Sequence, residues 1–208
     1  MIAAPAALAL LSLAHPAFST RALSEPARIS AHPQWLPVHI GMLLAVGILD
    51  LMLLSLTGPQ HGRWRHLVWL GAGMNVVLYS AFLGVDGLGG GLLVAAASAP
   101  GTDAAGLSAA VTVLFAAPLV ALLARLGGAG WLLAVLGLTG AAGNAGRSVA
   151  FGLVAATGAL SLEFSHAPPF GVAGAALLAV GMAGLLPALR SSGPRPESPL
   201  SAAAGRAE

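Results

Sequence analysis

Polar side chains interrupt several apolar stretches of this 208-residue chain, and their types and positions make them the first candidates for chemistry. An ionisable or amide group inside a membrane helix is costly unless it faces a partner or water. His39 and Asp50 are eleven residues apart, so a helix would place them within about 20° of each other on one face. The candidates for a polar site are His39, Asp50, Asn75, Tyr79, Asp86, Asn144 and Arg147.

Two further stretches carry a polar stripe of the same kind. Asn75, Tyr79 and Asp86 fall within about 40° of one another on a helical wheel. Asn144 and Arg147 are three residues apart, which again puts both on one face. Three predicted helices therefore each direct one polar stripe towards a common interior.

The expected depth of each polar residue in the membrane limits which of them can meet. Arg147 would lie about 24 Å above the cytoplasmic end of its predicted helix, at 1.5 Å per residue. His39 enters its helix from the outside, and Asp86 lies at the outer end of the next. We therefore predict that His39, Asp86 and Arg147 meet near the outer face, and that Asp50 lies too near the cytoplasm to join them.

Each of these residues also has a structural interpretation. His39 could be a hydrated imidazole at the membrane interface, and Arg147 could form a structural ion pair with an aspartate. Asp50 could pack between helices, carry protons or lie near the inner interface. The amides and the phenol most often serve as hydrogen-bonding groups between helices; these are Asn75, Tyr79 and Asn144.

Histidines in the predicted outer loops open a second possibility. Together with His39, the loop residues His15, His32 and His166 could bind a divalent metal, because imidazole is the commonest metal ligand. The metal candidates are His32, His39 and His166, although no HxxxH or HExxH spacing supports them. A haem would require paired imidazoles inside the bundle. No cofactor is otherwise expected.

Several reaction classes lack their motifs. The chain contains neither a GxSxG nor a GxxxxGK[ST] pattern, and it has no cysteine to form a disulfide, a thiolate metal site or a nucleophile. Its nine arginines are scattered, which argues against nucleic-acid binding. The sequence favours a non-enzymatic protein, with a membrane-embedded enzyme or metal protein as the alternative.

The elements that position these residues are predicted to be transmembrane helices. Hydrophobic residues make up 57% of the chain and charged residues 8%, with a mean hydropathy of +0.88, whereas soluble domains carry about 25% charged residues. We predict an all-α, polytopic helical bundle of six spans, or of five if the first segment is a cleaved signal. The predicted spans are 2–14, 36–56, 67–85, 107–126, 131–151 and 170–189, and residues 191–208 form a disordered tail.

Arginine placement predicts the orientation. Arg63, Arg65 and Arg125 fall on the same side as the C-terminal tail, so the positive-inside rule makes that side cytoplasmic. All nine cations are arginine, and the composition is typical of a GC-rich bacterial genome; we expect the inner membrane. The predicted partners are the lipid bilayer and, through small-residue helix faces, a second copy or another membrane protein.

A set of short motifs resembles a group of bacterial six-helix integral membrane proteins without an assigned activity. In that group an HP pair follows the first helix, an HP-x-W-x-x-x-H run leads into the second, and a DG pair and an AP segment come later. The matching residues are His15-Pro16, His32-Pro33, Trp35, His39, Asp86-Gly87 and Ala99-Pro100. The resemblance implies a six-helix topology and supplies no reaction. The leading hypothesis is a small binding, transport-related or accessory membrane subunit with a polar cluster in the outer leaflet.

Overall fold

The computed structural model describes residues 3–16, 32–58, 61–97, 99–101, 103–143 and 146–191. These residues form helices and contain no strand, so the fold is all-α. The separate helices are α1 (Ala3–Ala14), α3 (Trp35–Ser55), α7 (Ala104–Ala116), α8 (Pro118–Ala141), α9 (Gly146–Phe164) and α10 (Phe170–Ser191). One longer helical run consists of α4 (Arg63–Met74), η3 (Asn75–Tyr79), α5 (Ser80–Leu83), η4 (Gly84–Gly89) and α6 (Gly90–Ala97).

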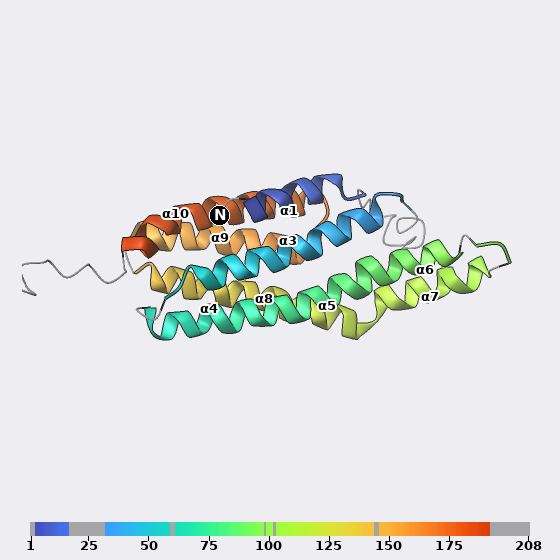
Figure 1. Ribbon diagram of the computed structural model, residues 1–208, viewed down its shortest axis with the longest axis horizontal. Coiled ribbons are helices and arrows are strands. Elements are labelled where there is room, and N and C mark those ends of the chain that lie inside the picture. Colours follow the sequence, from blue (N-terminus) through green and yellow to red (C-terminus); the bar gives the residue numbers. More distant parts are fainter. Residues whose placement is uncertain are drawn as a thin grey trace, which may run out of the picture.

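The helices run up and down a common axis (Figure 1). At one end α1 and α9 finish and α3 and α10 begin, and this end is called the histidine end because it carries His15, His39 and His166. At the other end α3 meets α4 and α8 meets α9. That end is called the arginine end, since Arg63, Arg65, Arg147 and Arg190 belong to its helix termini.

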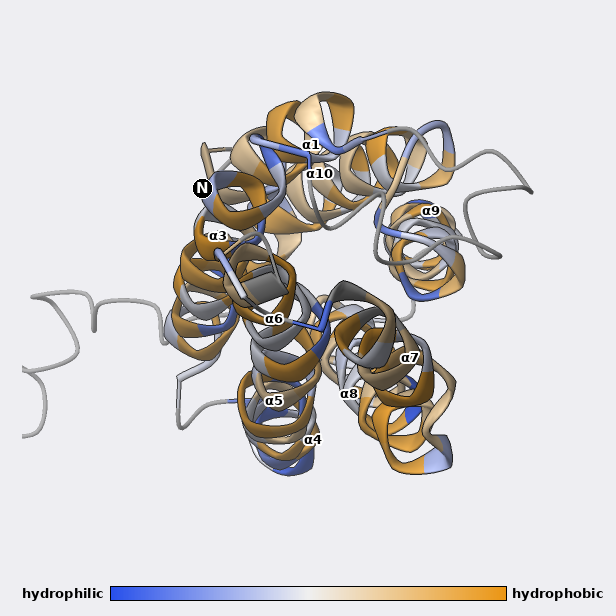
Figure 2. Cartoon of the chain, turned by 90° about the vertical axis from the view of Figure 1, so that its right-hand side faces the viewer, coloured by the Kyte–Doolittle hydropathy of each residue, from blue (hydrophilic) through white to orange (hydrophobic). Residues whose placement is uncertain are grey.

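Four helical segments are long and apolar enough to cross a membrane, which is fewer than the six predicted. They are Trp35–Ser55, Arg63–Ala96, Pro118–Ala141 and Phe170–Ser191. Two shorter apolar helices, Ala3–Ala14 and Ala105–Ala116, fall below the length of a full span. The helices consist mainly of apolar residues (Figure 2), and many large apolar side chains are exposed, among them Leu51, Leu119 and Leu153. This pattern is typical of a helical membrane protein.

The predicted spans 107–126 and 131–151 are wrong in their boundaries. The helix breaks at Ala117–Pro118 and then continues to Ala141 through the glycine-rich segment 127–130, which separates the two predicted spans. Proline suits a first helical position because it lacks the backbone donor. The glycines of this segment have no side chain and therefore let a neighbouring helix approach closely. A Cβ on Gly130 would meet the carbonyl oxygen of Gly71 at 2.6 Å.

The next turn also lies where no boundary was predicted. Gly143 has a φ of 88°, a left-handed conformation that favours glycine and ends a helix. A new helix, α9, then starts at Gly146 inside the predicted span. The apolar character of the surrounding residues concealed this turn.

The helical run from Arg63 extends well beyond the predicted span 67–85. Its 34 residues to Ala96 correspond to about 51 Å at 1.5 Å per residue, compared with about 30 Å for the apolar core of a bilayer. Residues 86–106 separate the predicted spans 67–85 and 107–126. Their described part is mainly helical, and α6 and α7 pack together as a hairpin beyond the histidine end (Figure 1).

Small residues determine how closely the helices pack. A Cβ on Gly174 would meet the Gly158 carbonyl at 2.8 Å, and one on Gly181 would meet the Ala155 nitrogen at 2.4 Å. The small-residue face of α10 is therefore packed against α9 of the same chain. Around the bundle, neighbouring helices follow the order α1, α3, α4, α8, α9 and α10, and α10 returns to α1 (Figure 2).

Candidate metal centre

Three histidines from three separate parts of the sequence come together at the histidine end. His15 follows the last residue of α1, His39 lies near the start of α3, and His166 lies between α9 and α10. One potential ligand atom from each residue lies within 4.8 Å of the other two. The turns between the helices thus place imidazoles that are far apart in the sequence in one cluster, called the histidine triad.

The three rings pack directly against one another. The ring centroids are 5.0 Å apart for His15 and His39, 4.8 Å for His15 and His166, and 5.5 Å for His39 and His166, each pair in an edge-to-face arrangement. His39 is fully buried, and His15 is 3% exposed. These imidazoles are therefore not the hydrated loop and interface residues that the sequence also allowed.

Backbone carbonyls determine which ring nitrogen carries the proton. The His39 Nδ1–H donates to the carbonyl oxygen of Trp35 over 2.8 Å, and the His15 Nδ1–H donates to that of Pro16 over 3.0 Å. A carbonyl can only accept, so the neutral form of each ring has its lone pair on Nε2. This is the usual arrangement of metal-binding histidines, whose second nitrogen is held by a carbonyl or carboxylate.

Two of the Nε2 atoms are buried with no hydrogen-bond partner in the described part of the chain. They belong to His39 and His166. A buried polar atom that lacks a partner costs about 1–3 kcal/mol. A bound cation would satisfy both atoms at once, which is a reason to regard the triad as a ligand set.

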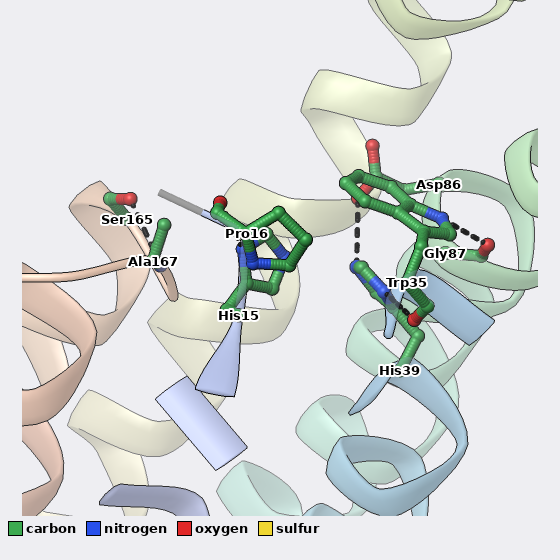
Figure 3. A network of polar contacts seen from close by, with 8 residues as sticks. All are labelled: His15, Pro16, Trp35, His39, Asp86, Gly87, Ser165 and Ala167. Atoms are coloured by element: carbon green, nitrogen blue, oxygen red, sulfur yellow. Dashed lines mark hydrogen bonds and ion pairs between the residues drawn. The ribbon is translucent and has the colours of Figure 1, made fainter. Parts of the chain in front are cut away.

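The carboxylate of Asp86 lies beside His39, outside the cluster that the three histidines form. Its Oδ2 is 3.9 Å from the Nε2 of His39, and the residue is 7% exposed (Figure 3). The indole Nε1–H of Trp35 donates to the carbonyl oxygen of Gly87 over 2.7 Å, which ties this turn to the start of α3. The predicted proximity of His39 and Asp86 is thus present.

A π-helical turn and a glycine position this carboxylate. Asp86 belongs to η4, and such turns are rare and often occur at functional sites. A Cβ on Gly87 would lie 2.3 Å from a carbon of the His39 ring. Only glycine therefore allows the backbone next to Asp86 to approach His39 this closely.

Burial keeps the two loop imidazoles neutral. Burial, together with a smaller contribution from the nearby His39 ring, lowers the pKa of His15 to about 4. Burial also lowers the pKa of His166 well below its usual value, with additional lowering from His15 and His39. A neutral imidazole is the form that binds a metal ion, so both residues are in the binding form at neutral pH.

The geometry suits a single ion. A zinc-like ion has ligand nitrogens about 2.0–2.1 Å away, so tetrahedral ligand atoms are about 3.4 Å apart. The ligand atoms of the triad, which lie within 4.8 Å of one another, would need to move closer together by up to about 1.4 Å. A haem held by two histidines places a planar macrocycle between them. The triad rings are already in edge contact, which leaves no space for that plane.

The remaining predicted ligand lies elsewhere. His32 is exposed, and its Nδ1 accepts from the backbone N–H of Gln34 over 3.3 Å. It is not part of the cluster that His15, His39 and His166 form. His15 takes the place predicted for His32, and the sequence signal was equal for both because each precedes a proline.

Arg147 does not meet Asp86 and His39. It is the second residue of α9 at the arginine end, is exposed, and lies with its guanidinium 5.7 Å from the Phe151 ring centroid. About 26 Å of helix separates it from Phe164 at the histidine end. The prediction failed because the turn at Gly143 reverses the chain before Arg147, which inverts its depth. Asn144, its predicted neighbour, lies outside the described residues.

The other predicted polar residues form contacts between helices. The amide of Asn75 donates to the Gly127 carbonyl over 3.0 Å, and the Tyr79 ring lies 5.3 Å from that of Trp131. The Trp131 indole donates to Asp50 Oδ1 over 3.1 Å. Asp50 thus lies deeper in the bundle, apart from the histidine triad.

Below the triad, a small cavity extends into the bundle. Its polar lining comes from Ser12, Tyr79, Trp131 and His166, and it has room for about one water molecule. The interior between the triad and Trp131 is therefore not completely packed.

Comparisons with known proteins give no further guidance, since no protein-family model, curated protein or solved structure matches this chain. The interpretation of the site depends on its own geometry.

Proposed function

We propose that this chain is a multi-pass membrane protein that binds a divalent transition-metal ion through His15, His39 and His166. The observation that carries the proposal is the convergence of three imidazoles, those of the buried His15 and His39 and the half-buried His166, whose potential ligand atoms lie within 4.8 Å of one another. Imidazole nitrogens suit ions such as Zn²⁺, Cu²⁺, Fe²⁺ and Ni²⁺. With no cysteine in the chain, no thiolate competes for the ion.

The proposal replaces the hypothesis of an outer cluster built around Arg147. That hypothesis relied on a cation opposite Asp86, and the cation lies at the arginine end. A metal ion would provide positive charge next to Asp86 in place of a side chain. The alternative of a metal-binding membrane protein is therefore favoured over a transport-related or accessory subunit.

The proposed topology has six crossings of the bacterial inner membrane. They are α1, α3, the run from α4 to α6, the pair α7 and α8, α9, and α10. The arginine end is cytoplasmic in this proposal, because Arg63, Arg65, Arg147 and Arg190 gather there and cationic residues accumulate on the inner side. The C-terminus is then cytoplasmic, and the metal centre lies towards the outer face.

The test is the metal content of the protein, purified in detergent through a tag without histidines. We expect about one equivalent of a divalent transition metal in the wild-type protein and its loss in His39→Ala and His166→Ala. His66→Ala is the matched control, since His66 is an exposed histidine of α4 at the arginine end. Thermal unfolding followed by circular dichroism checks that each variant is folded.

Two results would contradict the proposal. One is a folded wild-type protein that neither carries nor takes up a stoichiometric metal ion. The other is a metal content that stays the same in His39→Ala and His166→Ala, which would place the ion elsewhere.

A further inference from the structure

We propose that Asp86 is the fourth ligand of the ion held by the histidine triad, so that the centre is a closed, four-coordinate site. This inference rests on the proposed metal binding. It goes further by assigning the coordination number, the ligand set and the kind of role that such a site can have.

The position of the carboxylate is the first argument. Asp86 Oδ2 and His39 Nε2 are 3.9 Å apart, a separation close to that of two atoms sharing one zinc-like ion. The His39 Nδ1–H is already engaged by the Trp35 carbonyl. The ring therefore turns its lone pair towards the carboxylate, and a cation between these two acceptors would bind both of them.

Charge is the second argument. Three neutral imidazoles would leave a buried divalent ion with its full charge of +2, and burying an uncompensated charge is strongly unfavourable. One carboxylate reduces the net charge of the site to +1. Among the other described acids, Glu163 lies near His166 in the sequence. Its carboxylate, however, packs against Gly128 and interacts with the charge of Arg125, so it is directed to α8 rather than to the triad.

The construction of the η4 turn is the third argument. The turn holds Asp86 against α3 through the Trp35–Gly87 hydrogen bond and through the contact that Gly87 makes with the His39 ring. Gly91, one turn later, packs equally closely, since its Cβ would lie 2.9 Å from atoms of Trp35 and Leu36. Two glycines and one indole thus fix the carboxylate beside His39.

A fourth protein ligand limits what the metal can do. Structural zinc sites use four protein ligands, whereas catalytic sites use three and keep a position for water or substrate. A buried site with three imidazoles and one carboxylate would hold the ion tightly and exclude a substrate. The inference therefore favours a metal-holding centre over a membrane-embedded hydrolytic enzyme.

Cobalt substitution of the full-length protein in detergent tests this assignment. Four-coordinate Co²⁺ absorbs visible light far more strongly than six-coordinate Co²⁺. We expect the strong absorption in the wild-type protein and its loss in Asp86→Asn, together with Zn²⁺ affinity at least about tenfold weaker. Asp50→Asn is the matched control, because it removes another buried carboxylate, one that contacts Trp131 rather than the triad.

A second pair of variants leaves all four ligands in place. Gly87→Ala should displace η4 from His39 and weaken Zn²⁺ affinity, whereas Gly84→Ala in the same turn should not, because a Cβ there would meet nothing within 4 Å. This pair keeps the inference falsifiable if Asp86→Asn fails to fold.

The outcomes separate the two proposals. If the wild-type protein binds the ion in a His39-dependent way but Asp86→Asn and Gly87→Ala keep the spectrum and the affinity, the fourth-ligand assignment is overturned and metal binding stands. If the folded wild-type protein binds no ion, both proposals are overturned.

Discussion

At the scale of single residues, Asp50 and Trp131 show how this bundle tolerates a buried carboxyl group. Asp50 is 1% exposed, and its Oδ1 accepts the indole N–H of Trp131 over 3.1 Å. Trp131 is itself 2% exposed. The hydrogen bond links α3 to α8 in the interior, where losing it would leave the carboxyl group without this donor.

Trp131→Phe should therefore destabilise the protein. The change removes the donor and keeps an aromatic ring, so we expect a loss of about 1–3 kcal/mol in the free energy of unfolding. Thermal or chemical unfolding in detergent, followed by circular dichroism, measures it. The control is Trp69→Phe on an exposed face of α4, where only a cation–π contact with Arg65 is weakened, worth less than about 1 kcal/mol. Equal losses in both variants would contradict a specific role for the Asp50 contact.

The sequence predicted which polar residues lie within apolar helices better than it predicted the residues that they contact. Helical spacing identified His39, Asp50 and Asp86 as polar residues of apolar segments, and the structure buries all three. Their partners come from other helices: His15 for His39, and Trp131 for Asp50. Spacing along one helix carries no information on which residue faces it from the next helix. The sequence therefore named the four candidate histidines but could not select the three that meet.

At the scale of elements, the predicted spans succeed where an apolar segment has clear end signals, and they fail where the segment is rich in glycine. The segments at Trp35–Ser55 and Phe170–Ser191 closely match the predicted 36–56 and 170–189, since both are apolar and end in clear signals. The predicted span boundaries between 107 and 151 are wrong because glycines near 127–130 favour a turn in the sequence pattern, whereas the chain is helical there. In a membrane bundle a glycine more often marks a close helix contact. Among the described residues of this region, Gly143 alone has the positive φ of a chain reversal.

Two glycines of α4, Gly71 and Gly73, test this distinction. A Cβ on Gly71 would lie 2.4 Å from backbone atoms of α8, whereas one on Gly73 would meet nothing within 4 Å. Both alanine variants gain about 1 kcal/mol of helix propensity. We expect Gly71→Ala nevertheless to lose about 1–3 kcal/mol through the forced separation of α4 and α8, and Gly73→Ala to match or exceed the wild-type stability.

The free energies of unfolding of the two variants, measured in the same detergent, test whether Gly71 is a close contact between α4 and α8. A Gly71→Ala protein as stable as Gly73→Ala would mean that α4 and α8 do not pack as closely as described, and the position of Asn75 against Gly127 would then also be in doubt.

At the scale of the whole molecule, the two ends of the bundle differ in chemistry. Arg63, Arg65, Arg147 and Arg190 belong to the helix termini of the arginine end, whereas Arg125 lies within α8 near Glu163, contrary to its predicted place on the cytoplasmic side. The histidine triad lies at the opposite end. The corrected position of Arg147 strengthens this asymmetry, because the sequence had placed that charge near the outer face. The proposed orientation, with the arginine end in the cytoplasm, follows from it.

Single-cysteine labelling can test this orientation directly, since the natural chain contains no cysteine. A membrane-impermeant maleimide should label Gln34→Cys in intact cells, because Gln34 is exposed at the histidine end. Arg147→Cys and Ser191→Cys, both exposed positions at the arginine end, should react only after the membrane is permeabilised. Arg147 is the decisive position: labelling of Arg147→Cys in intact cells together with Gln34→Cys would return this residue to the outer side and contradict the chain reversal at Gly143. Labelling of the two arginine-end positions without Gln34→Cys would instead invert the whole bundle and place the metal centre towards the cytoplasm.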